Sequence, residues 1–369
     1  MHRLLIATLV LGMLAAQPAA AGFKTRIEKP DHGFFFYQYS LAGGWDTREP
    51  GDFGLADRGP RTQFTLEWLS KDERNLQRGY TRLFQPSQWN FKIALEADPA
   101  ENDDDRPGYN LRLFDVWVQF STKWDRTNFW LGHRSLPYGQ NPKLDPELTF
   151  MPNQAPLDLG FGRDTGFFLV TPVSPRWDLD LAVTAGGFLD RPLVVVQEVD
   201  GSYDVDETID YRSSWLVTAR LGRPRFERVE IGVFAAVGST HRVSGPLTDV
   251  ARIGFDWVVK RQEDWKLVTQ LAVGESGGDG RGSRAVANLL NSFELYLGPR
   301  WRLGVTNAWR SEDFDAGRQE TGTVFGMVSY ATTRDSRIRL HPFLEYHDAT
   351  STRDSGVLVQ LCLGCGWRK

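Results

Sequence analysis

Two cysteines near the carboxyl end of the chain have a spacing that suggests chemistry. Cys362 and Cys365 are the two cysteines in 369 residues, and two residues separate them. A structural zinc site needs four ligands, and no histidine follows the pair as in a haem-attachment motif. We therefore expect a disulfide between Cys362 and Cys365, with a metal or redox role as the weaker alternative, and we expect no metal site.

A second candidate is a pair of arginines, Arg337 and Arg339, that share one face of an alternating segment. Because like charges on one face repel, they need an acidic neighbour or an anion beside them. The same alternation places Lys92 and Arg252 on the polar face of their own segments, among acidic and basic residues. If these polar faces line a common water-filled lumen, their mixed charges give only a weak ion preference. The alternative is that they form ion pairs between strands that simply keep the wall polar. The other charged residues in this phase are Glu96, Asp115, Arg220, Glu230, Asp256, Glu294, Arg302 and Glu345.

The arrangement of histidines and the charge balance favour neither catalysis nor nucleic-acid binding. The six histidines are scattered. The 43 basic and 47 acidic side chains give a net charge of −4, which provides no basic surface for nucleic acid. We therefore expect neither an enzyme nor a nucleic-acid partner, and no cofactor.

The elements that position these side chains are strands. Trp89, Phe91, Ile93 and Leu95 alternate with polar or small residues, and the same period of two recurs along the chain. The apolar face of the segments repeatedly ends in an aromatic residue suited to a water–lipid boundary. A soluble sandwich would not place so many large aromatics outside, so the pattern predicts an all-β transmembrane barrel with a polar interior. These aromatics are Trp68, Trp89, Trp177, Trp215, Trp265, Trp309 and Tyr346.

The alternating segments predict a barrel of about sixteen antiparallel strands, wide enough for a water-filled channel. We expect the strands near 33–42, 62–69, 88–96, 109–120, 127–133, 164–171, 177–186, 213–221, 228–237, 250–259, 264–274, 287–297, 300–309, 321–331, 337–346 and 355–363.

From the fourth strand onward, short and long connections alternate, as periplasmic turns and extracellular loops do in bacterial barrels. The short links are Ser121–Arg126, Pro172–Arg176, Gly222–Glu227, Lys260–Glu263, Gly298–Pro299 and Thr332–Ser336. The long links are Arg134–Arg163, Gly187–Arg212, Gly238–Asp249, Glu275–Val286 and Arg310–Glu320. The link Ser70–Ser87 departs from this rule, since it is long where a short turn is due.

The amino-terminal segment, residues 1–21, has the pattern of a signal peptide. Arg3 is followed by the apolar stretch Leu4–Ala16 and the small residues Ala19–Ala21. The alternative is a buried helix. The signal peptide predicts export, and the barrel pattern of residues 22–369 predicts the bacterial outer membrane.

One region resembles the phosphate-selective (O and P type) porin family. The residues that carry the resemblance are Asp115–Phe120, Phe129–Gly139, Phe150–Asn153 and Arg163–Phe168. It implies a trimeric outer-membrane pore whose third loop, here residues 134–163, folds into the lumen and narrows it.

The charges of this loop depart from the family pattern. The family's anion selectivity relies on clustered basic side chains, whereas this loop mixes both signs and has no lysine-rich run. Phosphate specificity is therefore not transferred. The expected constriction residues are Arg134, Lys143, Asp145, Glu147, Asp158 and Arg163.

The predicted function is an outer-membrane porin for passive diffusion of small hydrophilic solutes or ions. The expected partners are the lipid bilayer, lipopolysaccharide, the solutes and, by resemblance, two further copies in a homotrimer. An anion- or phosphate-preferring channel is the alternative in the same class. A plugged structural or adhesive barrel and a hydrolase on the barrel wall remain alternatives from other classes.

Overall fold

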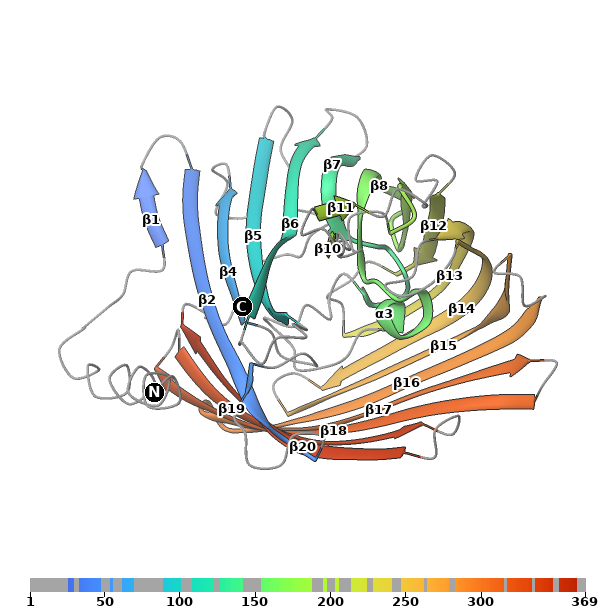
Figure 1. Ribbon diagram of the computed structural model, residues 1–369. Helices are drawn as coiled ribbons and strands as arrows, with labels where there is room; N and C mark the ends of the chain where they lie inside the picture. The colour runs from blue at the N-terminus through green and yellow to red at the C-terminus, as the bar shows by residue number, and fades with distance from the viewer. Residues whose placement is uncertain are drawn as a thin grey trace.

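The fold comes from a computed structural model, which shows a curved wall of strands in chain order (Figure 1). It describes residues 26–29, 33–47, 54–55, 62–69, 89–100, 108–121, 127–141, 154–187, 195–197, 203–205, 214–223, 228–240, 247–261, 264–278, 283–314, 317–333, 336–347 and 352–363. The signal peptide predicted for residues 1–21 lies outside these ranges, as does the exceptional link Ser70–Ser87.

The main sheet contains eighteen described strands, of which β1 and β3 are short additions beside β2. The remaining sixteen form a closed antiparallel ring, because β20 pairs with β19 on one side and with β2 on the other. The expected barrel of about sixteen strands is confirmed.

The wall strands each overlap a segment expected from the alternation. The first eight are β2 (Gly33–Asp46), β4 (Thr62–Leu69), β5 (Trp89–Ala100), β6 (Gly108–Ser121), β7 (Asn128–Ser135), β8 (Arg163–Ser174), β9 (Trp177–Thr184) and β12 (Trp215–Gly222). The next eight are β13 (Val229–Thr240), β14 (Thr248–Arg261), β15 (Trp265–Gly277), β16 (Arg284–Leu297), β17 (Trp301–Phe314), β18 (Gly317–Thr333), β19 (Ser336–His347) and β20 (Thr352–Leu363). The other elements are β1 (Arg26–Lys29), β3 (Gly54–Leu55), the separate hairpin β10 (Val195–Gln197) with β11 (Tyr203–Val205), and the helix α3 (Gln154–Leu159). Within the described part of the chain, no helix is long and apolar enough to cross a membrane.

The wall has the reverse polarity of a soluble barrel. On β14 the side chain of Ile253 is 63% exposed on the outer face, while its neighbour Arg252 is 4% exposed on the inner face. The same alternation along the other strands leaves large apolar side chains outside, where lipid rather than water satisfies them. These include Leu131, Phe167, Val183, Val233, Val237, Phe255, Leu271, Val273, Val305, Val324, Leu340 and Leu344.

Aromatic side chains lie outside near both ends of the strands. Trp177 and Trp301 begin strands that follow tight turns, and Trp215 and Tyr346 lie near the opposite rim. All four are exposed. They correspond to two aromatic belts, one at each boundary of the apolar band.

The expected alternation of short and long links holds in part. The links expected to be long at Gly238–Asp249 and Glu275–Val286 shrink to residues 241–247 and 278–283, about as long as the expected short links, because the flanking strands extend further than expected. We expected a long link at Arg310–Glu320, but β17 runs to Phe314 and β18 starts at Gly317, and these two residues are paired. The two strands continue to pair beyond the apolar band, because backbone hydrogen bonding does not require apolar side chains. The prediction of a long loop from the polar sequence of this stretch was therefore wrong.

Candidate pore constriction

The connection between β7 and β8 enters the barrel. Its described ends, residues 136–141 and 154–162, both lie against the inner wall, and α3 contacts β16 and β17. Figure 1 shows α3 inside the curve of the wall rather than outside it.

An apolar cluster joins this loop to the wall. Leu136 and Leu159 are fully buried, and the ring of Tyr138 meets the ring of Phe234 edge-on, with 4.6 Å between centroids. Phe234 lies on β13 in the inward phase, where a water-facing residue would be polar. The wall therefore carries an apolar patch that the loop covers. The wall residues of this cluster are Trp117, Trp130, Phe168, Ala182, Leu216, Phe234, Ala236, Val250 and Ala272.

An ion pair within the same contact joins Asp158 of α3 to Arg252 of β14. The Nε of Arg252 lies 2.9 Å from one carboxylate oxygen of Asp158 and 3.2 Å from the other. The hydroxyl of Tyr138 also donates to Asp158, and an Nη of Arg252 lies 2.6 Å from the Ser276 hydroxyl. Both charged side chains are fully buried, so each depends on the other for its charge compensation.

A third contact places the loop backbone directly on β15. The backbone N–H of Gln140 donates to the side-chain oxygen of Gln270 over 2.7 Å. Gly139 precedes it at φ +56°, and a Cβ at this position would lie 2.1 Å from the same oxygen. Glycine is therefore required here both for the left-handed backbone and for the close approach.

The side chain of Gln140 donates to Asp256, which also accepts two hydrogen bonds from Arg220, each of 2.7 Å. Within the loop, Asn141 donates to the backbone oxygens of Leu136 and Gly162 over 3.1 and 2.6 Å and so holds the two ends together.

The phenol of Tyr138 stays protonated in this environment. Burial raises the pKa of Tyr138 well above its ordinary value of 10.0, and the negative charge of Asp158 raises it further. The phenol is therefore a hydrogen-bond donor to Asp158 throughout the physiological pH range.

The other expected constriction residues divide into three groups. Arg163, at the start of β8, lies against the wall with its Nε 3.1 Å from Asp115. Arg134, at the end of β7, stacks on Trp130 at 4.2 Å from the ring centroid. Lys143, Asp145 and Glu147 lie outside the described residues.

Elsewhere on the inner wall the structure places Arg337 and Arg339 in the inward phase of β19, both buried. Arg339 is paired in register with Ser329 of β18, which is paired in turn with Arg302 of β17. One Nη of Arg339 lies 3.0 Å from the side-chain oxygen of Gln360. Among the described residues its buried Nε has no hydrogen-bond partner. Arg302, Arg337 and Arg339 are called the arginine patch below.

Lys92 is known by its register alone: it lies opposite Glu67 of β4 and Trp117 of β6. Cys362 is buried in the inward phase of β20, and Cys365 lies outside the described residues, so their disulfide stays a prediction.

Ion pairs also line the wall away from the loop. Lys260 lies 2.8 Å from Glu230, and Glu294 lies 3.5 Å from Lys266 and 3.9 Å from Arg302. Many inward charges thus compensate one another across strands, as the alternative interpretation of these charges expects.

Sequence reasoning missed Tyr138, Gln140 and Gln270 as parts of the loop contact. A signal was present in the inward phase of β12 to β15, where Leu216, Phe234 and Ala272 are apolar. Apolar residues facing a water-filled lumen need a cover, and the loop is that cover.

No family model and no curated sequence matches the chain. Solved outer-membrane proteins do match its structure. The anion-selective porin from Comamonas acidovorans has a TM-score of 0.60 and 11% identity, covering 89% of this chain and 98% of that one. The trimer form of OmpT, an outer membrane protein of Vibrio cholerae, has a TM-score of 0.60 and 7% identity, covering 90% and 99%. OmpF of Salmonella typhi in complex with daunomycin has a TM-score of 0.57 and 8% identity, covering 92% and 100%. The chain therefore has the fold of outer-membrane porins, and the narrower phosphate-selective family is not confirmed.

Proposed function

We propose that the protein is an outer-membrane porin that lets small hydrophilic solutes or ions diffuse passively through its barrel. The observation that carries this proposal is the polarity of the closed wall, apolar outside and charged inside. A soluble binding protein or a packed structural barrel would need the reverse arrangement. The signal peptide expected for residues 1–21 supports export to the outer membrane, where lipid and lipopolysaccharide would surround the barrel.

The inward loop supplies the proposed size filter. Its two described ends are fixed to β13, β14 and β15 by the Tyr138–Phe234 contact, the Asp158–Arg252 pair and the Gln140–Gln270 hydrogen bond. Because the loop occupies part of the lumen, solutes pass through the space that it leaves open. One of the similar structures is a trimer form of OmpT, which supports a homotrimer for this chain as well.

Liposome swelling with sugars of increasing size tests the proposal. Vesicles that contain the folded barrel should swell fastest with pentoses and progressively more slowly with di- and trisaccharides. Empty vesicles serve as the control. A folded barrel that admits no sugar would contradict the proposal and favour the plugged or enzymatic alternatives.

A preference for anions is the second candidate, and the arginine patch favours it. Arg302 of β17 and Arg339 of β19 are both in register with Ser329 of β18, Arg337 shares the inward face of β19, and Glu294 lies 3.9 Å from Arg302. The Comamonas porin of similar structure is anion-selective, which supports the same preference. Phosphate selectivity has no such support, since the sequence of residues 134–163 contains no lysine-rich run.

The reversal potential across a KCl gradient tests this second candidate. Replacing Arg337 and Arg339 together by Gln should shift the potential toward cation preference, because two positive charges leave the lumen. In a matched control, Arg261 and Arg353 are both replaced by Gln. Both are exposed outside the lumen, so the reversal potential should stay nearly unchanged. Equal potentials for both double variants would remove the anion preference.

A further inference from the structure

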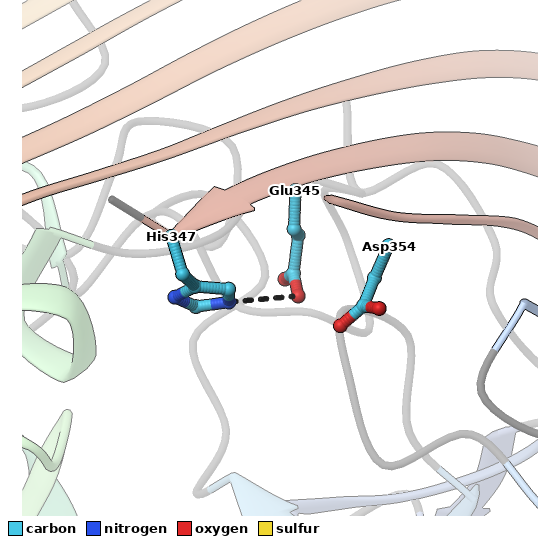
Figure 2. Close-up of side chains that lie close together, drawn as sticks. All are labelled: Glu345, His347 and Asp354. Atoms are coloured by element: carbon cyan, nitrogen blue, oxygen red, sulfur yellow. Dashed lines mark ion pairs between the residues drawn. The ribbon is translucent and has the colours of Figure 1, made fainter. Parts of the chain in front are cut away.

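Three side chains near the rim that carries the long loops form a cluster that the proposed transport function does not use (Figure 2). Glu345 and His347 of β19 and Asp354 of β20 bring one nitrogen and two oxygen donors within 4.8 Å of one another. The Nε2 of His347 lies 3.8 Å from a carboxylate oxygen of Glu345. All three residues are half-buried.

Strand geometry explains why these residues meet. Glu345 and His347 are two residues apart, so they share the inward face of β19 with Arg337 and Arg339. Asp354 is paired directly with Glu345 across the β19–β20 ladder. Figure 2 shows the three side chains leaving their strands on the same side.

The charges of the cluster favour a cation. Two carboxylates directly opposite each other on neighbouring strands repel. The imidazole of His347 lies beside Glu345 and adds a nitrogen donor, which is a good ligand for metal ions.

We propose that Glu345, His347 and Asp354 form a binding site for a divalent first-row metal ion of the Zn²⁺ type at the loop-side mouth of the barrel. Imidazole and carboxylate together suit Zn²⁺, Ni²⁺ or Cu²⁺, whereas Ca²⁺ and Mg²⁺ favour sites built of oxygen alone. Three protein ligands leave a coordination position for water, and a bound ion offsets both carboxylate charges. His347 is 38% exposed by its side chain, so an ion can reach the site from the mouth.

The first test is calorimetric titration of Zn²⁺ into the detergent-folded, EDTA-treated barrel without lipopolysaccharide, which itself binds cations. We expect one Zn²⁺ per chain. Replacing His347 by Gln, or Asp354 by Asn, should weaken the affinity by at least about tenfold, since even residues that merely orient ligands change affinity by that amount. Ca²⁺ at the same concentration should bind much more weakly.

Asp313→Asn is the matched control, because Asp313 is an exposed carboxylate at the same rim on β17. The affinity of the Asp313→Asn variant for Zn²⁺ should equal that of the unchanged protein. Heat-modifiable gel mobility verifies that every variant is folded. Any of three results would overturn the site. These are no binding of Zn²⁺ to the unchanged protein, binding of Zn²⁺ to the His347 and Asp354 variants as tight as to the unchanged protein, and binding of Ca²⁺ as tight as that of Zn²⁺. Because binding is measured without transport, none of these results depends on whether the barrel conducts.

Discussion

Asp158 and Arg252 place two fully buried opposite charges in the contact between the loop and the wall. Removing one partner of such a pair leaves the other charge buried without compensation, which costs about 3–5 kcal/mol. Asp158→Asn should therefore release the loop from β14 while the barrel remains closed. Hydrogen exchange should become faster in residues 136–141 and 154–162 and should stay unchanged in β18 to β20.

A paired replacement separates charge from packing. Asp158→Leu combined with Arg252→Met removes both charges and keeps apolar volume, so it should restore slow exchange in the loop. Slow exchange in Asp158→Asn itself would show that the pair does not anchor the loop.

Tyr138 gives the same contact a pH dependence. Its pKa in the folded protein lies above the ordinary value of 10.0, because burial and Asp158 disfavour the phenolate. The unfolded chain therefore loses the proton first. The contribution of the protonated Tyr138 phenol to the free energy of unfolding is complete below about pH 10. It is lost as the pH rises above that value toward the pKa of Tyr138 in the folded protein.

Tyr138→Phe makes this dependence measurable, since it keeps the ring against Phe234 and removes the titrating group. The difference in unfolding free energy between the unchanged protein and Tyr138→Phe should be constant from pH 7 to pH 9 and should decline above about pH 10. Urea titrations at each pH provide the values. A difference that stays constant through pH 11 would contradict the buried, protonated phenol.

At the residue scale, the alternation predicted the inward direction of Asp115, Arg220, Arg252 and Arg339, because the phase of a strand fixes which face each side chain takes. It could not predict that Arg252 pairs with Asp158. That contact joins residues 94 positions apart, and nothing local specifies it.

At the scale of the element, the strands were predictable because a lipid-facing side and a water-facing side impose a period of two over each span. The residues at which the strands end were harder to predict. β17 and β18 extend to Phe314 and Gly317 beyond the apolar band, where hydrogen bonding between polar segments continues without a hydropathy signal. The six-residue helix α3 was not expected, because it is too short to show a helical period.

The depth of β14 in the membrane can be tested with two charges on one face. Ile253 lies near the middle of the strand and Asp249 near its start, and both point outward. Ile253→Arg should lower the free energy of unfolding by about 2–4 kcal/mol, whereas Asp249→Arg should change it by about 0–1 kcal/mol. Urea unfolding in lipid vesicles measures both. Equal costs would mean that this face does not lie in the apolar layer.

At the scale of the whole molecule, one closed ring of sixteen strands separates an apolar exterior from a charged interior, and the described ends of one loop pack against the inner face of this ring. The ring was predictable from the number of alternating segments. The route of the loop was expected from a family resemblance rather than from the periodicity. The apolar patch that anchors the loop is formed by side chains from the neighbouring strands β12 to β15, so no single segment of the sequence specifies it.

Single-channel conductance of the purified, folded protein in a planar lipid bilayer tests the central claim most directly. A water-filled barrel predicts stable, stepwise increases in current that scale with salt concentration. A heat-modifiable, correctly folded barrel that inserts into the bilayer and carries no current would contradict the porin function and show that the lumen is closed.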